Sequence, residues 1–158
     1  MNEIAEQLSV FQQALQDAPF EFAFIGGSAL SLLISRKGVA DIRVSKDVDI
    51  IVDAPTLPRY HDIEDMLREM GFKNDTSDDA PLCRWIYKGR KIDVLPQHES
   101  VLNWRSKWFP EAFDSIRQVK FHGRTYPSIA APYFVALKIE AFEDRGKSDF
   151  LGSQDFED

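Results

Sequence analysis

Two aspartates separated by one residue stand in the segment RVSKDVDIIVD, residues 43–53, which is otherwise typical of an apolar β-strand. Side chains alternate along a strand, so Asp47 and Asp49 share one face while Val48 points to the other. At a spacing of roughly 7 Å, two such carboxylates repel each other unless a cation lies between them. Carboxylate oxygens suit Mg²⁺ or Mn²⁺ better than zinc. The pair therefore predicts a site for a divalent metal.

A third acid stands in the segment RKIDVLP, residues 90–96. Asp93 lies between an isoleucine and a valine, so in a strand it projects away from its apolar neighbours. If strand 91–95 pairs with strand 47–52, the three carboxylates meet on one face of the sheet. The alternative is a solvent-facing strand that binds no metal, where Asp-x-Asp pairs also occur. Asp53, at the end of the first segment, is interpreted as a turn former.

A glycine turn is the second element that could bind a ligand. Gly26, Gly27 and Ser28 join an apolar strand at 20–27 to a helical pattern at 28–38. Glycines there let the backbone approach a ligand closely, and the free N–H groups of a helix start attract phosphate. Ser28 is expected to cap this helix. The turn lacks the lysine of a P-loop and the spacing of a dinucleotide-binding fingerprint.

The elements that position these residues follow from hydrophobic periodicity and turn residues. Helices are expected at 3–16, 28–38, 60–72 and 131–146, with a short helix within 99–116; a polar loop is expected at 74–81, and hairpins at 83–96 and 119–129, turning at 88–90 and 122–124. Strands and helices in this order predict a single α/β or α+β domain over residues 1–158, built on one mixed β-sheet flanked by helices.

Composition narrows the function further. The chain has 158 residues and a net charge of −7, which argues against a protein that simply coats nucleic acid. Residues 84–124 carry nine Lys/Arg against four Asp/Glu, net +5, and this stretch is either a phosphate-facing surface or a solvated face. One cysteine excludes an internal disulfide and a multi-cysteine zinc site. Without a signal peptide or membrane-spanning stretch in its pattern, the sequence predicts a cytoplasmic protein.

Together, the turn GGSAL, the segment RVSKDVDIIV and the segment RKIDVL resemble the nucleotidyltransferase superfamily, whose fold is shared by polymerase-beta-like enzymes. Within it, the chain most resembles the nucleotidyltransferases of abortive-infection toxins. Arg43, Ser45, Asp47 and Asp49 match their Arg-x-Ser-x-Asp-x-Asp segment position by position. A later segment, residues 135–158, resembles their helix with a lysine followed by an arginine and aspartates; its matching residues are Lys138, Arg145, Asp149 and Asp155.

The resemblance implies a nucleotidyltransferase that moves a nucleoside monophosphate from an NTP to an acceptor and uses Mg²⁺ or Mn²⁺. Asp47 and Asp49 are then expected to hold two divalent ions, with Asp93 completing one metal shell and accepting the proton of the attacking hydroxyl. The residues expected to bind the nucleotide phosphates are Gly26, Gly27, Ser28, Arg43 and Lys138.

The acceptor is left open by the sequence: an RNA end, a protein side chain and a small molecule all fit. The toxin-like pattern favours RNA or protein, and it implies a toxin–antitoxin system with a neutralising protein partner. Two other classes remain. The chain is alternatively a catalytically inactive nucleotide-binding or regulatory module of the same fold, or a phosphate-ester hydrolase that uses the same acids on Mg²⁺.

Overall fold

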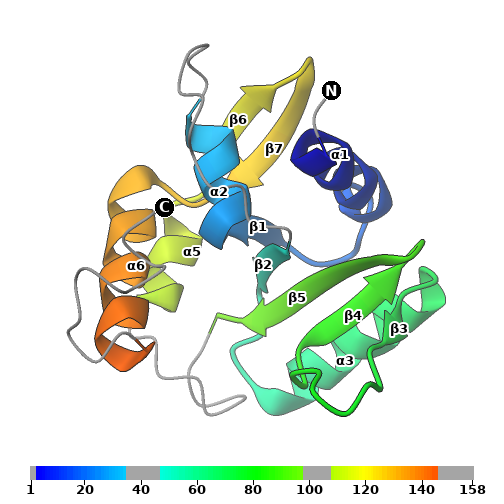
Figure 1. The fold of residues 1–158 in the computed structure, drawn as a ribbon. Coiled ribbons are helices and arrows are strands. Elements are labelled where there is room, and N and C mark those ends of the chain that lie inside the picture. The colour runs from blue at the N-terminus through cyan, green and yellow to red at the C-terminus, as the bar shows by residue number, and fades with distance from the viewer. Residues whose placement is uncertain (1–2, 35–46, 98–107, 146–158) are drawn as a thin grey trace.

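The structure, a computed structural model, describes residues 3–34, 47–97 and 108–145 (Figure 1). A seven-stranded mixed sheet forms its centre, in the order β3-β4-β5-β2-β1-β7-β6. The strands are β1 (Phe22–Ile25), β2 (Val48–Val52), β3 (Lys73–Asn74), β4 (Arg84–Tyr87), β5 (Arg90–Pro96), β6 (Arg117–Phe121) and β7 (Arg124–Ser128). The helices are α1 (Glu3–Leu15), α2 (Gly26–Leu33), α3 (Leu57–Glu69), α5 (Phe109–Asp114) and α6 (Ala131–Arg145). The predicted α/β fold with one mixed sheet is confirmed.

Helices cover both faces of this sheet (Figure 1). One core cluster packs α1 and α3 against the sheet and includes Ile50, while a second packs α2, α5 and α6 against it and includes Ile51. Because successive side chains of a strand point to opposite faces, Asp49 lies on the same face as Ile51, toward α2 and α6. None of the described helices is both long enough and apolar enough to cross a bilayer.

Both predicted hairpins are present, and their turns have the same backbone conformation. Lys88 and Gly89 have φ values of 49° and 74°, and His122 and Gly123 have values of 45° and 78°. Two left-handed residues in succession form a type I′ turn, whose backbone twist matches the twist of the two strands that it joins. The first turn fixes the pairing of β4 with β5, and thereby the residue that faces Asp93 across the hairpin.

The start of α2 differs from the prediction. The helix begins at Gly26, directly after Ile25, and no side chain caps it. Ser28, expected as the cap, instead lies within the first turn. The helix ends at Leu33, and the predicted stop at Gly38 lies outside the described residues.

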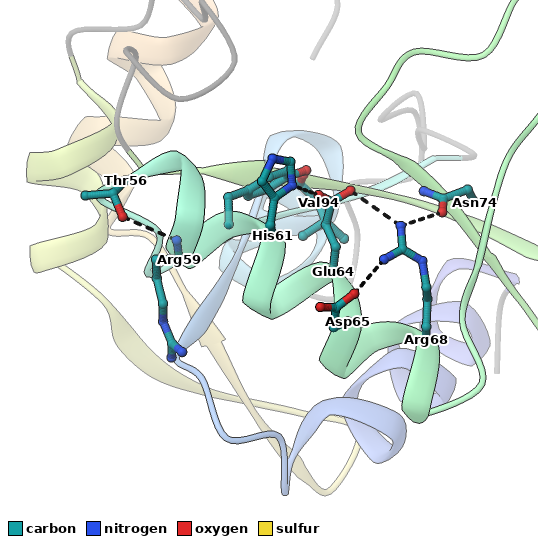
Figure 2. A network of polar contacts seen from close by, with 9 residues as sticks. Thr56, Arg59, His61, Glu64, Asp65, Arg68, Asn74 and Val94 are labelled. Carbon is teal, nitrogen blue, oxygen red and sulfur yellow. Dashed lines mark hydrogen bonds and ion pairs between the residues drawn. The ribbon is translucent and has the colours of Figure 1, made fainter.

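The start of α3 also precedes its predicted position at residue 60. Thr56 caps this helix, because its hydroxyl oxygen accepts a hydrogen bond from the backbone N–H of Arg59 at 3.3 Å (Figure 2). On the inner side of α3, the hydroxyl of Tyr60 donates to the carbonyl oxygen of Val94 at 2.8 Å. Burial raises the pKa of this hydroxyl above its ordinary value, so it stays protonated. The bond fixes α3 to β5.

The outer face of α3 carries a polar network (Figure 2). Arg68 donates to Asp65 at 2.9 Å and to Asn74 at 3.1 Å, and Glu64 contacts His61 at 2.6 Å. The contacts of Arg68 with Asp65 and of Glu64 with His61 join side chains one helical turn apart, whereas the contact with Asn74 joins α3 to β3. All three are exposed, so each contributes little stability. They place the histidine of this helix at the surface.

Candidate active site

Asp49 and Asp93 are opposite one another on neighbouring strands. β2 and β5 pair in parallel, with Asp49 in register with Asp93. Neighbouring strands are roughly 4.8 Å apart, and residues in register project to the same face. The condition set on the sequence, that the strand containing Asp93 pairs with the strand containing Asp49, is therefore met. Asp47 immediately precedes β2 and is exposed.

The pKa of Asp49 reflects both its burial and the charges around it. Burial is the main cause that raises the pKa of Asp49 from 3.8 to about 7, and the charges of Asp93 and Asp47 raise it as well. The positive charges of Arg84 and Lys138 act in the opposite direction. Asp47, Asp49 and Asp93 are referred to below as the acid cluster. In the absence of a further cation, Asp49 is therefore only partly ionised near neutral pH.

Gly26 brings the start of α2 against this cluster. Its φ is +60°, a left-handed conformation that glycine adopts without strain. A Cβ at this position would stand 2.8 Å from Oδ2 of Asp49, which is closer than a carbon can approach an oxygen. The carboxylate of Asp49 thus lies beside the first turn of α2, whose backbone N–H groups favour negative ligands.

Ser28 fastens this turn to β2. The residue is fully buried, and its hydroxyl donates to the carbonyl oxygen of Ile25 at 2.6 Å. The same hydroxyl oxygen accepts a longer bond, 3.4 Å, from the backbone N–H of Asp49. Ser28 therefore positions the glycine turn relative to Asp49, and direct contact of its hydroxyl with phosphate stays a prediction.

Arg84 is the functional candidate that the sequence reasoning missed. Its Nε donates to Oδ1 of Asp93 at 2.8 Å and its Nη2 to Oδ2 at 3.1 Å, so both carboxylate oxygens are engaged. The two residues are cross-strand partners in the β4–β5 hairpin. A type I′ turn at Lys88 and Gly89 implies this pairing, so counting back from the turn would have placed Arg84 opposite Asp93.

Lys138 lies on α6, which packs against α2. Helix α6 packs on the face of the sheet toward which Asp49 points. The side chain of Lys138 is half-buried, and its charge lowers the pKa of Asp49. Arg43 and Ser45 lie outside the described residues, as do Asp149 and Asp155.

The side chains near Asp49 are of the types that bind a divalent ion, but their positions in the structure do not form a metal site. Among the described residues, no three His, Cys, Asp or Glu side chains are grouped closely enough to hold a metal. Both oxygens of Asp93 face Arg84. Nevertheless, the donors are carboxylate oxygens, and a bound cation would favour the ionised form of Asp49, whose pKa is raised by burial and by the charges of Asp93 and Asp47. Asp47 and Asp49 therefore fit as ligands, and Asp93 fits once Arg84 has moved.

A depression of about 550 Å³ lies elsewhere, at the far end of β1 from the acids. Gln12, Phe22, Phe113 and Pro127 are among the residues that line it, and none of the three aspartates does. Phe22 pairs with Val52 at one end of β2, whereas Asp49 stands at the other. The acid cluster is the candidate site because of the chemistry of its side chains, although the depression lies elsewhere.

The chain has the fold of the nucleotidyltransferases, as comparison with solved structures shows. No protein-family model and no curated protein sequence matches it. An antigenic nucleotidyltransferase-like protein from Paracoccidioides brasiliensis is similar in structure, with a TM-score of 0.64, 17% identity, and 98% of this chain and 73% of that chain covered.

The solution structure of the antibiotic-resistance factor ANT(2″)-Ia gives a TM-score of 0.59 at 12% identity, covering 96% of this chain and 79% of that chain. A crystal structure of ANT(2″)-Ia with adenylyl-2″-tobramycin gives 0.56 at 15% identity, covering 90% and 80%. At these identities, the likeness establishes the fold.

Proposed function

We propose that this protein is a metal-dependent nucleotidyltransferase, which moves a nucleoside monophosphate from an NTP to an acceptor and releases pyrophosphate. The observation that carries the proposal is the register of Asp49 with Asp93, beside the glycine start of α2, in a chain with the nucleotidyltransferase fold. Carboxylates next to a phosphate-binding helix start are what two-metal phosphoryl transfer requires.

Each residue of the cluster has a role in this proposal. Asp47 and Asp49 would hold Mg²⁺ or Mn²⁺, which would neutralise the phosphates and stabilise the attacking and leaving oxygens. The N–H groups of Gly26 and Gly27 would bind phosphate oxygens. Asp93 would accept the proton of the attacking hydroxyl. The hydroxyl oxygen then forms a bond to the α-phosphorus, while the bond from the α-phosphorus to the pyrophosphate oxygen breaks.

Cations of the chain would complete the phosphate site. Lys138, on α6, acts on Asp49 through its charge and would neutralise charge that develops on the phosphates. Ser28 holds the glycine turn in place through its bonds to Ile25 and Asp49. Arg43, which matches the toxin-like pattern, is proposed as a second cationic ligand.

The acceptor is proposed to be a hydroxyl group. Two observations favour different kinds of acceptor molecule. The structure of ANT(2″)-Ia contains an adenylylated tobramycin, which favours a small molecule. The toxin-like pattern over residues 22–53 and the net positive stretch at 84–124 favour RNA or a protein side chain, with an antitoxin protein as a partner. In either case we place the activity in the cytoplasm, where NTPs are available.

The test is transfer of label from each α-³²P NTP, with Mg²⁺ or Mn²⁺, to bulk RNA, to added protein or to a panel of hydroxylated antibiotics. We expect Asp49→Asn to abolish transfer. Asp53→Asn is the matched control, since Asp53 follows the same strand but accepts a hydrogen bond from Gln97 at 2.8 Å, and transfer should persist. Release of free phosphate from γ-labelled NTP without transfer would support a hydrolase instead, and nucleotide binding without turnover would support an inactive module.

A further inference from the structure

The ion pair of Arg84 with Asp93 occupies the position where the proposed mechanism needs a free carboxylate. Both side chains are mostly covered, with exposed fractions of 21% and 15%. The two parallel bonds at 2.8 and 3.1 Å engage both oxygens of Asp93. A paired charge at this depth is costly to break unless each partner gains another partner of opposite charge.

The charges of the cluster explain why a metal ion alone is a poor replacement for Arg84. Three carboxylates face two cations, Arg84 and Lys138, so the free site carries little net negative charge. Mg²⁺ in proteins is usually held by one or two carboxylates together with substrate phosphates. An NTP brings both the additional negative charge and a second set of oxygens.

The guanidinium of Arg84 has the geometry to change partners. Its planar fork matches phosphate as well as carboxylate, and its charge is permanent. The residue lies in β4, next to β5, on the face of the sheet that carries the acids. A phosphate bound at the start of α2 would lie near Asp49, which the charge of Arg84 already affects.

We propose that Arg84 is a built-in cation that holds Asp93 in the nucleotide-free protein and moves to the phosphates of an incoming metal–nucleotide complex. The inference rests on the proposed function, and it assigns Arg84 as a nucleotide-binding and gating residue of that site. Asp93 is released only when nucleotide is present, so metal and nucleotide bind together and water is not activated in the empty site.

The test is the affinity of the protein for Mn²⁺, with and without α,β-methylene NTP analogues. It is measured from the loss of the free-ion electron paramagnetic resonance signal, after subtraction of the Mn²⁺ that each analogue binds in a titration without protein. We expect the wild-type protein to bind Mn²⁺ at least about tenfold more tightly with an analogue than without one. In Arg84→Met, Mn²⁺ affinity without nucleotide should rise about tenfold, since a positive charge in contact with a carboxylate is lost. Adding Asp93→Asn to Arg84→Met should reverse that gain.

Arg68→Met is the matched control, because Arg68 forms an exposed ion pair with Asp65 on α3; Mn²⁺ affinity should not change. Affinity for the nucleotide analogue should fall in Arg84→Met and not in Arg68→Met. If Arg84→Met does not fold, Arg84→Lys keeps the charge but loses the fork and should raise Mn²⁺ affinity by a smaller factor.

Unchanged or weaker Mn²⁺ binding in the folded Arg84 variants would overturn the inference and make the pair a fixed structural contact. If the wild-type protein transfers label in the assay above, that result removes only the role of Arg84. If the wild-type protein binds no Mn²⁺ with the analogue of any of ATP, GTP, CTP and UTP and transfers no label, the proposed function itself is wrong.

Discussion

The carboxylate of Asp49 and the backbone of Gly26 leave no space for a side chain between them. A Cβ on Gly26 would be 2.8 Å from Oδ2 of Asp49, and the glycine holds a φ of +60°. The contact joins the first residue of α2 to Asp49 on β2. A helix start and a strand that come from separate segments of the chain therefore form one site.

Gly26→Ala is expected to disrupt this site more than the backbone conformation alone explains. A left-handed alanine costs about 1–2 kcal/mol, and the new methyl group also displaces the carboxylate of Asp49. Gly89→Ala is the control, since Gly89 has a φ of +74° but nothing within 4 Å of the added Cβ. Urea unfolding should show the larger loss for Gly26→Ala, and only this variant should lose NTP binding by calorimetry. Equal losses in both variants would contradict the close contact.

Asp49→Asn is expected to stabilise the metal-free protein above neutral pH while it abolishes transfer. The pKa of Asp49 is about 7 in the folded protein and 3.8 ordinarily, so the folded state binds its proton more tightly. Stability from this group is therefore complete below about pH 4, falls as pH rises toward 7, and then stays low. The variant lacks this slope and should exceed wild type by about 1–3 kcal/mol at pH 8.

Urea unfolding at pH 5 and pH 8, with EDTA present, measures the effect. Asp53→Asn, outside the cluster, should keep the wild-type slope. Mg²⁺ with an NTP analogue should raise the stability of the wild-type protein at pH 8, because bound ligand favours the folded state, and should not raise that of Asp49→Asn. A wild-type protein that becomes more stable from pH 5 to pH 8 in EDTA would contradict the raised pKa.

The strands that carry Asp49 and Asp93, and the direction in which each acid projects, could be predicted from the sequence, because they depend on alternation and on turn residues. Apolar residues on both sides of each acid fix which face it takes. The glycine turn at Gly89 sets the hairpin that contains Asp93. Thus the strands and their glycine turns follow from local patterns, whereas the pairing of β2 with β5, which brings the two acids together, is a tertiary contact that the sequence left as a condition.

The partner of Asp93 and the start of α2 depend on tertiary contacts that no local pattern contains. The sequence places Arg84 opposite Asp93 but does not say that the guanidinium turns onto it. Ser28 is a good capping residue by type, yet its hydroxyl is used in the interior to join Ile25 to Asp49. Helix α2 can begin earlier, at Gly26, because glycine accepts the left-handed conformation that the contact with Asp49 requires.

Ser28→Ala is expected to loosen the glycine turn. The change leaves the carbonyl of Ile25 and the N–H of Asp49 without the hydroxyl that joins them, at a cost of about 1–3 kcal/mol. Ser31→Ala is the control, since that hydroxyl bonds within α2 to the carbonyl of Gly27 at 3.0 Å, and should cost under about 0.5 kcal/mol. Thermal unfolding compares the two, and equal shifts would contradict a tethering role for Ser28.

Lys138→Met is expected to lower the rate of transfer because it removes a positive charge near Asp49, while the protein still folds. The positive charge of Lys138 lowers the pKa of Asp49, so its loss should move the pH dependence of transfer to higher pH. Loss of one cation near the phosphates should also lower kcat/KM for the NTP by about tenfold or more at pH 7. Lys120→Met, which removes an exposed lysine of β6, should change neither quantity. The pH profile of kcat/KM is the deciding measurement: a reduced rate with an unshifted profile would mean that Lys138 contacts the nucleotide without acting on Asp49.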